Sequence, residues 1–356
     1  MHIALGVSYY KTYLPKNIVI KNYELSKKQA QFWEMFYKKG LGEFCYRNKV
    51  DISYLKFPYK EGLDNKDLPS FDNEKKIVIP VGGGKDSTVV LEAIKASKYK
   101  PRAISVGFPR PIKDTIDKSG LDNIVIERKI SENIKDLKDA LNGHVPISGI
   151  IAFILLCAGQ IYDFNYVLMA NEASANQGNT GDVNHQWSKS FEFEEAYNEY
   201  VSENIIKGFN YISFLRPLSE LHIAKLFSTL TNYHDVFTSC NKAFKLDKEK
   251  RIDYWCASCD KCRFVFLILA VFMKKQDLVK IFKKNMLNDM DNLKGYEELT
   301  GLSGIKPFEC VGEIGECVVA FNNLSNEWQE DFVVKNILIR NFAFVKLSLN
   351  ESVTQL

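Results

Sequence analysis

The stretch Ile77-Val78-Ile79-Pro80-Val81-Gly82-Gly83-Gly84-Lys85-Asp86-Ser87-Thr88 is a short β-branched run that ends in three glycines, followed by an Asp-Ser pair. The pair opens an amphipathic stretch, so the pattern predicts a strand, a tight turn and the first turn of a helix. Glycine permits positive φ and lets the backbone approach a ligand closely. The N–H groups at the start of a helix attract anions. The sequence therefore predicts a loop that binds phosphate.

Residue spacing excludes two common phosphate loops. Asp86 stands where a P-loop needs Ser or Thr, and Ser87 stands where a dinucleotide fingerprint needs its last glycine. The loop resembles the S-G-G-x-D-S loop of the ATP pyrophosphatases, with Gly82 in place of the first Ser. That resemblance implies cleavage of ATP between its α- and β-phosphates and transfer of AMP to a substrate oxygen. An ordinary glycine-rich turn is the alternative interpretation.

Strands and helices alternate along the middle of the chain. We predict strands at 77–81, 103–106, 124–126 and 166–170, and helices at 27–46, 87–96, 132–141 and 147–162. Alternation at this spacing predicts an α/β fold with a doubly wound parallel sheet, in which ligands bind at the carboxyl ends of the strands. The resemblance implies the adenine nucleotide alpha-hydrolase type of sheet.

The chain is long enough for more than one domain. We expect an N-terminal extension over residues 1–70, an ATP-binding α/β domain over 71–235, and a cysteine cluster with the C-terminal region over 236–356. The polar segment 62–73 contains Pro69 and is typical of a linker.

The composition limits the classes of partner that we expect the protein to bind and the cellular compartment in which we expect it. A net charge of +3 over 356 residues is too small to indicate binding to nucleic acid or to a membrane. The N-terminus lacks the basic region of a signal peptide. Eight cysteines without an export signal indicate a reducing compartment, where clustered thiols bind metal more often than they form disulfides. We expect a cytoplasmic protein.

A polar loop follows the last predicted strand, from Asn171 to Ser190. Almost every side chain in it donates or accepts hydrogen bonds, and loops of this length are uncommon unless they are functional or disordered. Trp187 and His185 argue against disorder. The loop is expected to belong to a binding cleft, with a solvated surface loop as the alternative.

Several motifs resemble one family, the UDP-N-acetyl-alpha-D-muramoyl-L-alanyl-L-glutamate epimerases of peptidoglycan synthesis. They are Gly82 to Ser87, Glu172-x-Ser174-Ala175-Asn176, Val183-Asn184-His185-Gln186-x-Ser188-Lys189-Ser190-x-Glu192, Ser239-Cys240-Asn241, Trp255-Cys256-x-x-Cys259-x-Lys261-Cys262 and Lys306-Pro307-Phe308-Glu309-Cys310-Val311-Gly312. The resemblance implies an isomerase that uses ATP and Mg²⁺ to invert the terminal L-glutamate of a cell-wall precursor. Its implied partner is this small peptide substrate, with no nucleic acid and no membrane.

The nucleotide has a clear chemical purpose in such an enzyme, because adenylation of the α-carboxylate removes its charge and acidifies Cα. Backbone and hydroxyl donors of Gly82, Gly83, Gly84 and Ser87 would hold phosphates, and Lys85 would neutralise developing charge. Asp86 is either a ligand of Mg²⁺ or the N-cap of the helix.

Inversion needs a base on one face of Cα and an acid on the other. The candidates are His185, Lys189, Glu172 and Cys310, and the sequence does not rank them. Neutral hydrogen bonds to the glutamyl group are expected from Ser174, Asn176, Asn184, Gln186, Ser188 and Ser190. The isolated histidines, among them His144, are interpreted as structural.

The strongest metal signal is Cys256-x-x-Cys259-x-x-Cys262, preceded by Cys240. Four thiolates with two-residue spacers match a closed tetrahedral zinc site with a structural role. An iron–sulfur cluster and unconnected core thiols are the alternatives.

Two other functions compete with the epimerase. One is a different adenylating ATP pyrophosphatase, which would thiolate or amidate its substrate. The other is a regulator that binds the nucleotide without chemistry. Solvent deuterium at Cα of a glutamyl peptide would exclude thiolation and amidation, and release of pyrophosphate that depends on the peptide would exclude the regulator.

Overall fold

The computed structural model describes residues 1–63, 67–72, 74–178, 183–245, 248–304 and 306–340. The chain forms two compact units, and each is built from separated stretches. Unit 1 comprises residues 1–80, 90–108 and 121–216, and unit 2 comprises residues 81–89, 109–120 and 217–356. The expected division into 1–70, 71–235 and 236–356 stays a prediction.

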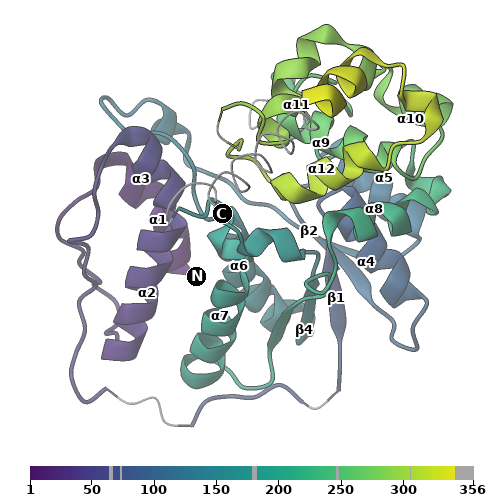
Figure 1. The fold of residues 1–356 in the computed structure, drawn as a ribbon. Coiled ribbons are helices and arrows are strands. Elements are labelled where there is room, and N and C mark those ends of the chain that lie inside the picture. Colours follow the sequence, from purple (N-terminus) through teal and green to yellow (C-terminus); the bar gives the residue numbers. More distant parts are fainter. Residues whose placement is uncertain (64–66, 73, 179–182, 246–247, 305, 341–356) are drawn as a thin grey trace, which may run out of the picture. The chain divides into compact units, whose positions relative to one another are not determined.

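A five-stranded parallel sheet forms the centre of unit 1, with strand order β3-β2-β1-β4-β5 (Figure 1). Its strands are β1 Ile77–Pro80, β2 Arg102–Val106, β3 Asn123–Ile126, β4 Tyr166–Met169 and β5 Asn210–Ser213. The β-branched run of β1 is buried on both faces, as expected for a central parallel strand. The predicted α/β fold with a parallel sheet is confirmed.

Three helices of unit 1 precede the sheet, namely α1 His2–Tyr13, α2 Lys27–Gly40 and α3 Gly42–Asn48. Unit 1 also contains α6 Ile147–Tyr162 and α7 Phe191–Asn204. α4, Lys85–Lys95, begins in unit 2 and ends in unit 1. Right-handed crossovers and the strand order place the β1–β2 connection and the β4–β5 connection on opposite faces, which is the doubly wound arrangement.

The N-terminal helices share one hydrophobic core with α6, α7 and the sheet. The ring of Phe32 stacks on that of Tyr200 with centroids 4.2 Å apart. The indole Nε1 of Trp33 donates a hydrogen bond of 3.0 Å to the hydroxyl of Tyr200, so the buried polar atom of this large side chain is satisfied. The N-terminal extension is therefore an integral part of unit 1.

Unit 2 is mainly helical outside the glycine loop. Its helices are α5 Arg110–Ser119, α8 Glu220–Ser228, α9 Asp260–Ala270, α10 Lys275–Phe282, α11 Leu293–Leu299 and α12 Ile314–Asn322. α9 is buried on nearly all sides and packs against α8, α10, α11 and α12. Within the described part of the chain, no helix has the length and apolarity that crossing a bilayer requires.

Two helix predictions need correction. The predicted helix at 132–141 is wrong, because only Glu132–Lys135 forms a 3₁₀ turn. The backbone after this turn forms hydrogen bonds with α1 instead. The N–H of Leu141 donates to the carbonyl of Thr12 at 2.9 Å, and the carbonyl of Lys138 accepts from the hydroxyl of Tyr13 at 2.7 Å. The helix predicted at 27–46 is interrupted at Leu41, which separates α2 from α3.

Candidate active site and metal centre

Two loops of the predicted site begin at neighbouring strands. The glycine loop follows β1 directly, and the polar loop follows β4, which pairs with β1 through Ile77 opposite Tyr166. Chain connections run in opposite directions from these two strands, so this is the topological switch point of the sheet. In open α/β sheets, ligands bind outside the carboxyl ends of the strands at such a point.

The glycine loop has one position where a side chain would strain the backbone and one position with open space around it. Gly83 has φ of +78°, and an added Cβ would lie 3.2 Å from the backbone of Pro111 and Ile112 in unit 2. Gly82 is exposed, and a Cβ there would meet nothing within 4 Å. The close approach of the loop to α5 therefore requires glycine at position 83, whereas position 82 has space for a side chain.

Lys85 is buried at the start of α4 and is paired with two carboxylates of unit 2. Its Nζ contacts the side chains of Asp86 and Glu220. Burial alone lowers the pKa of Lys85, but Coulombic attraction by Asp86 and Glu220 raises it above the usual value overall. Lys85 therefore remains a fixed positive charge beside the glycine loop. Glu220 comes from α8 and belongs to no recognisable motif in the sequence.

The other residues of the α4 N-terminus show how the helix begins. Asp86 lies in the first turn of α4, one residue after its start, so it is not the N-cap. Its side chain is 30% exposed and can still offer oxygen atoms to a cation. The hydroxyl of Ser87 donates to the carbonyl of Gly84 at 3.2 Å.

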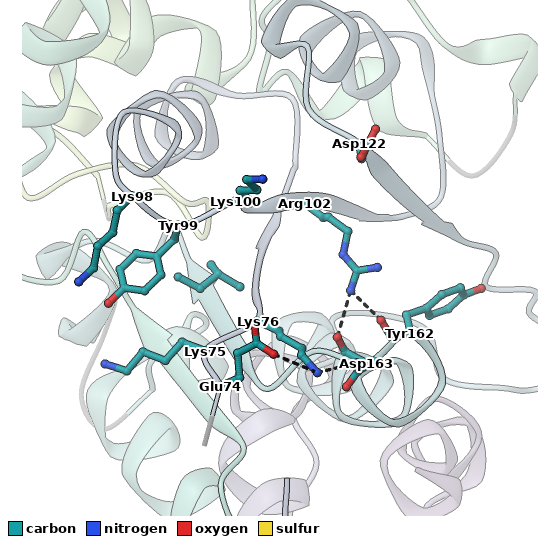
Figure 2. Close-up of a pocket in the computed structure, with 11 residues that line it drawn as sticks. Glu74, Lys75, Lys76, Lys98, Tyr99, Lys100, Arg102, Asp122, Tyr162 and Asp163 are labelled. Atoms are coloured by element: carbon teal, nitrogen blue, oxygen red, sulfur yellow. Dashed lines mark hydrogen bonds and ion pairs between the residues drawn. The ribbon is translucent and has the colours of Figure 1, made fainter. Parts of the chain in front are cut away.

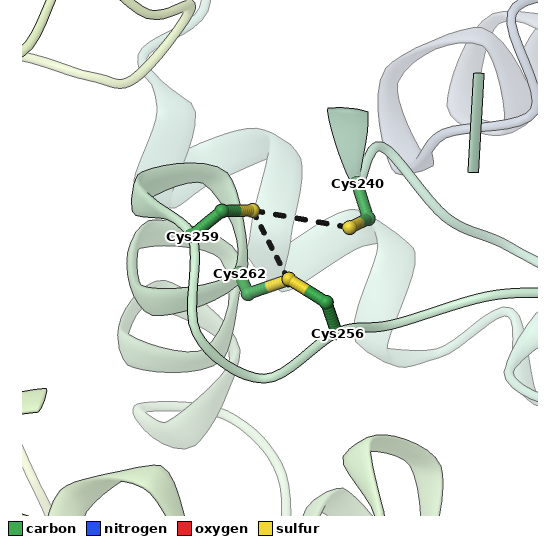
Figure 3. Close-up of side chains that lie close together, drawn as sticks. All are labelled: Cys240, Cys256, Cys259 and Cys262. Carbon is green, nitrogen blue, oxygen red and sulfur yellow. Dashed lines mark hydrogen bonds between the residues drawn. The ribbon is translucent and has the colours of Figure 1, made fainter. Parts of the chain in front are cut away.

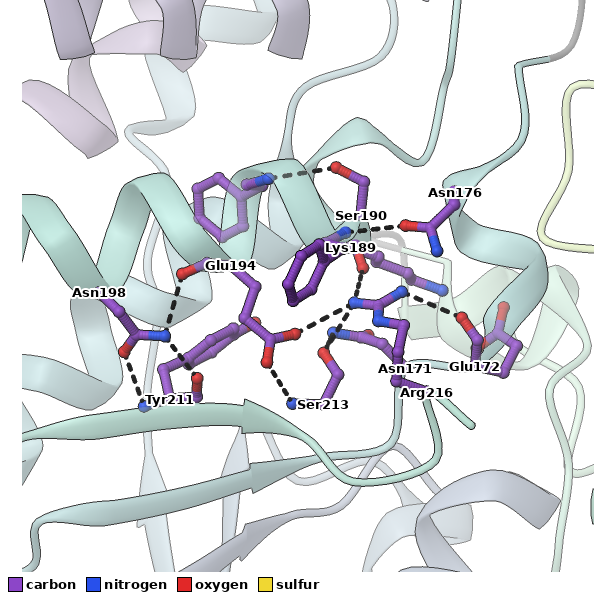
Figure 4. A network of polar contacts seen from close by, with 12 residues as sticks. Asn171, Glu172, Asn176, Lys189, Ser190, Glu194, Asn198, Tyr211, Ser213 and Arg216 are labelled. Carbon is purple, nitrogen blue, oxygen red and sulfur yellow. Dashed lines mark hydrogen bonds and ion pairs between the residues drawn. The ribbon is translucent and has the colours of Figure 1, made fainter. Parts of the chain in front are cut away.

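Arg216 holds the polar loop at both ends (Figure 4). Its Nη1 donates to the carbonyl of Glu172 at 3.1 Å, and its Nη2 donates to the carbonyl of Lys189 at 2.6 Å. The same Nη2 contacts Glu194 of α7 at 3.2 Å and the hydroxyl of Ser213 at 2.9 Å. A half-buried guanidinium thus ties the loop to α7 and to the end of β5, although no motif marked this residue in the sequence.

Most of the predicted substrate-binding side chains in the polar loop form hydrogen bonds within the loop or to the start of α7. Asn176 accepts from the N–H of Phe191 at 2.8 Å, and Ser190 is the N-cap of α7 and accepts from the N–H of Phe193. Asn184 donates to the carbonyl of Ala175 at 3.0 Å.

The remaining members of this set are buried. Ser174 donates to the carboxylate of Glu172 at 3.2 Å, Gln186 accepts from Nζ of Lys189 at 3.3 Å, and Ser188 is 5% exposed. Residues 179–182 of the loop lie outside the described residues. The substrate contacts stay predictions.

His185 has a neighbour that sequence analysis interpreted as structural. The rings of His185 and His144 meet edge to face, with centroids 6.2 Å apart. Nδ1 of His144 lies 3.1 Å from Oε2 of Glu43 on α3, and Glu43 also accepts from Nε of Arg47. Burial lowers the pKa of His144, and Glu43 offsets part of that effect. His144 is therefore not isolated, and unit 1 brings an imidazole with a carboxylate partner next to His185.

Cys310 lies apart from these candidates in the sequence and belongs to unit 2. It is half-buried, in the segment between α11 and α12 that forms no helix or strand where it is described. Glu309, the residue before Cys310, accepts a hydrogen bond of 2.7 Å on its carboxylate from the side-chain amide of Asn241. This contact places the Cys310 segment beside the segment that carries Cys240.

The four predicted metal ligands Cys240, Cys256, Cys259 and Cys262 converge (Figure 3). All four sulfurs lie within 4.8 Å of one another, and three of the Sγ–Sγ distances are 3.4, 3.6 and 3.8 Å. Four sulfurs bound at about 2.3 Å to one tetrahedral zinc ion would lie about 3.8 Å apart. The cluster thus has the donors and spacing of a closed metal site.

Local structure explains this convergence. Cys259 is the N-cap of α9 and Cys262 lies in its first turn, where the helix dipole favours thiolates. Ala257 has φ of +53°, which turns the chain sharply between Cys256 and Cys259. Hydrogen bonds from Cys259 and Cys262 lower the pKa of Cys240 well below its usual value. A lowered pKa favours the thiolate, which is the form that binds metal.

A separate cavity of about 890 Å³ lies at the amino ends of β1 and β2, the opposite edge from the two loops (Figure 2). Two of the cationic side chains that line it, Lys76 and Arg102, are bound to other groups of the protein. Nζ of Lys76 pairs with Asp163 at 2.7 Å, and Arg102 donates to the carbonyls of Tyr162 and Asp163. We therefore do not assign the cavity to the candidate site.

Comparisons with known proteins match nearly the whole chain. The family model of the MurL N-terminal domain matches residues 1–214, and that of the MurL C-terminal domain matches residues 236–348. The chain is similar to three proteins named UDP-N-acetyl-alpha-D-muramoyl-L-alanyl-L-glutamate epimerase.

These relatives come from three organisms. The protein from Xanthomonas oryzae pv. oryzae (strain MAFF 311018) is 37% identical over 347 residues, which cover 95% of this chain and 77% of the relative. That from Micromonospora sp. is 38% identical over 355 residues, with the same coverage. That from Salinispora tropica is 38% identical over 347 residues, covering 95% of this chain and 75% of the relative.

A solved structure, described as a predicted subunit of tRNA methyltransferase from Methanocaldococcus jannaschii, aligns with 44% of this chain and 75% of its own length. Its sequence identity is 15% and its TM-score is 0.27, and a likeness this weak carries no argument about function.

Proposed function

This chain belongs to the MurL family, and from that membership we propose that it is an epimerase that inverts the terminal L-glutamate of UDP-N-acetylmuramoyl-L-alanyl-L-glutamate. We further propose that the reaction depends on ATP and Mg²⁺. The observation that carries the ATP dependence is the glycine loop, in which Gly83 adopts positive φ against the backbone of α5 at the start of α4.

ATP would transfer an adenylyl group to the α-carboxylate with pyrophosphate as the leaving group, which would remove the negative charge and make the carbonyl an electron sink. Hydrolysis of the adenylate after inversion would release AMP and restore the carboxylate. Backbone N–H groups of Gly82, Gly83 and Gly84 at the α4 N-terminus would bind the phosphates. Lys85, held by Glu220, would contribute positive charge, and the partly exposed Asp86 would hold Mg²⁺.

Proton removal and return would use residues of the polar loop and its surroundings. His185, Lys189 and Glu172 all belong to unit 1, and His144 with its Glu43 partner joins this set. An imidazole titrates near neutral pH and can serve as base or acid. Cys310 remains the candidate from unit 2.

We propose that the cysteine cluster binds one structural Zn²⁺. The support is the set of four thiol donors at distances that fit a tetrahedral ion, with no open position for a substrate.

The decisive experiment follows the α-hydrogen. The purified protein is incubated in D₂O with ATP, Mg²⁺ and the UDP-muramoyl dipeptide, and the product is examined by NMR and mass spectrometry. We expect deuterium at Cα of D-glutamate, together with AMP and pyrophosphate.

The matched control substrate carries a carboxamide in place of the α-carboxylate of glutamate, and it should neither exchange nor consume ATP. Formation of AMP without deuterium at Cα would instead indicate thiolation or amidation, and binding of ATP without pyrophosphate release would indicate a regulator. Either result contradicts the proposed epimerase.

A further inference from the structure

Thr238 lies between the glycine loop and the cysteine cluster of unit 2 and is completely buried. Its backbone N–H donates to the carbonyl of Gly83 at 2.8 Å. Its hydroxyl donates to the carbonyl of Tyr254 at 2.8 Å and accepts from the N–H of Cys240 at 3.1 Å. One small, buried side chain thus satisfies two backbone groups, of which the N–H of Cys240 is itself buried.

These bonds join three segments that are distant in sequence. Tyr254 stands two residues before Cys256, so both cysteine-bearing segments are attached to the Thr238 hydroxyl. The glycine loop is attached to the backbone of the same residue. The next residue, Ser239, has its Cβ 3.5 Å from where a Cβ on Gly84 would lie. The glycine loop therefore rests directly on the chain that leads into the cluster.

The glycine loop needs such support because a run of three glycines has little conformational preference of its own. A loop that binds phosphate through backbone N–H groups must keep those groups aligned before the ligand arrives. The carbonyl of Gly83 fixes the orientation of the peptide that continues to Gly84. A metal ion that holds Cys240 and Cys256 would in turn fix both partners of the Thr238 hydroxyl.

We propose that Thr238 is a positioning residue that couples the metal site to the nucleotide loop, so that loading of the cysteine cluster with metal sets the affinity for ATP. The inference rests on the proposed nucleotide binding by the glycine loop. It adds a role for the cluster beyond holding the fold, and it predicts that the metal is required for ATP to bind even though it never touches the nucleotide.

The test compares Thr238→Val, which keeps the shape but removes the hydroxyl, with Thr238→Ser, which restores it. Thr229→Val makes the same change at an exposed position near the end of α8 and serves as the control. Affinity for ATP with Mg²⁺ is measured by calorimetry in the absence of peptide, and metal content by elemental analysis. The visible spectrum of Co²⁺-substituted protein reports the geometry of the cluster.

We expect Thr238→Val to weaken ATP binding by about tenfold, because it removes the hydrogen-bond partner of the buried N–H of Cys240 and of the carbonyl of Tyr254. We expect Thr238→Ser and Thr229→Val to stay within about threefold of the unaltered protein. The Co²⁺ spectrum should change in Thr238→Val only. Unchanged ATP affinity in a folded Thr238→Val protein would overturn the proposal, whereas absence of ATP binding in the unaltered protein would overturn the proposed function itself.

A second measurement uses the unaltered protein and does not depend on how the variants fold. Hydrogen–deuterium exchange is followed in peptides that cover residues 82–88 and 147–162, before and after removal of the metal with a chelator. We expect faster exchange in the glycine loop, no change in α6, and recovery when Zn²⁺ is returned. Equal exchange in the loop without metal, or equally increased exchange in both regions, would contradict the coupling.

Discussion

Nδ1 of His144 lies 3.1 Å from Oε2 of Glu43, and the imidazole ring of His144 packs edge to face against that of His185. Two histidines that are separated in sequence thus lie in contact, and Glu43 is a carboxylate partner for the ring of His144. The pair gives unit 1 two adjacent imidazoles, and His144 has a carboxylate beside its ring. Neighbouring charged groups are how proteins assign acid and base roles to titratable side chains.

The first prediction concerns the pH dependence of stability at His144. Burial lowers its pKa in the folded protein, so below about pH 6.5 the unfolded chain binds this proton more readily. The contribution of His144 therefore destabilises the fold at low pH and vanishes as the pH rises above that value. We expect His144→Asn to lose less stability than the unaltered protein between pH 7.5 and pH 5, as measured by urea unfolding.

Two further variants sharpen that test. Glu43→Gln removes the charge that raises the pKa of His144, so stability should fall more steeply with decreasing pH than in the unaltered protein. The exposed His2 provides the control, and His2→Asn should leave the pH dependence unchanged. A His144→Asn protein whose stability follows the same curve as the unaltered protein would exclude this account.

The second prediction uses the contrast between Gly82 and Gly83. Gly83→Ala forces a side chain into positive φ and against backbone atoms of α5, whereas Gly82→Ala points into open space. We expect Gly83→Ala to cost about 1–2 kcal/mol of stability and to weaken ATP binding by about tenfold or more. Gly82→Ala should change stability by no more than about 0.5 kcal/mol. Thermal unfolding and calorimetry measure both, and equal effects would show that the loop is not shaped as described.

The third prediction concerns Arg216, whose guanidinium is 16% exposed in its ion pair with Glu194. Arg216→Met leaves that carboxylate and the carbonyls of Glu172 and Lys189 without their donor, and we expect it to cost about 3 kcal/mol. Arg110 is 60% exposed in its ion pairs, and Arg110→Met should cost clearly less stability than Arg216→Met. Urea unfolding compares the two, and similar costs would contradict the anchoring role.

The fourth prediction concerns metal at the cysteine cluster. Elemental analysis should find about one zinc ion per chain, and Cys256→Ser should lose most of it together with thermal stability. Cys45→Ser is the control, because Cys45 belongs to unit 1 and lies outside the cluster. A brown protein that contains iron and inorganic sulfide would contradict the zinc assignment and indicate an iron–sulfur cluster instead.

Patterns within short segments of the sequence predict a large part of the fold and of the candidate site. The strand, glycine turn and helix from Ile77 onward could be predicted because strand and helix periods and turn residues are properties of short segments. The cysteine cluster could be predicted because three of its members, Cys256, Cys259 and Cys262, share a two-residue spacing. The fourth predicted ligand, Cys240, lies outside this spacing pattern and precedes Cys256 in the sequence. The fold brings it to the other three.

Contacts between distant residues could not be predicted in the same way. Arg216, Glu220 and Glu43 are single charged residues with no spacing pattern, and their roles depend on partners that the fold brings near. The failed helix at 132–141 has the same origin, because its backbone groups bond α1 rather than one another. Propensity describes a segment alone, and tertiary contacts can override it.

Unit 2 gathers residues 81–89, 109–120 and 217–356, and this order has a consequence for biosynthesis. The ribosome completes Gly83 long before it reaches Thr238 and Glu220, the residues that bind the glycine loop and Lys85. The nascent chain therefore exposes an unsupported glycine loop until the C-terminal part of unit 2 emerges. A truncated chain that ends before residue 217 would carry the loop yet lack the support that shapes it.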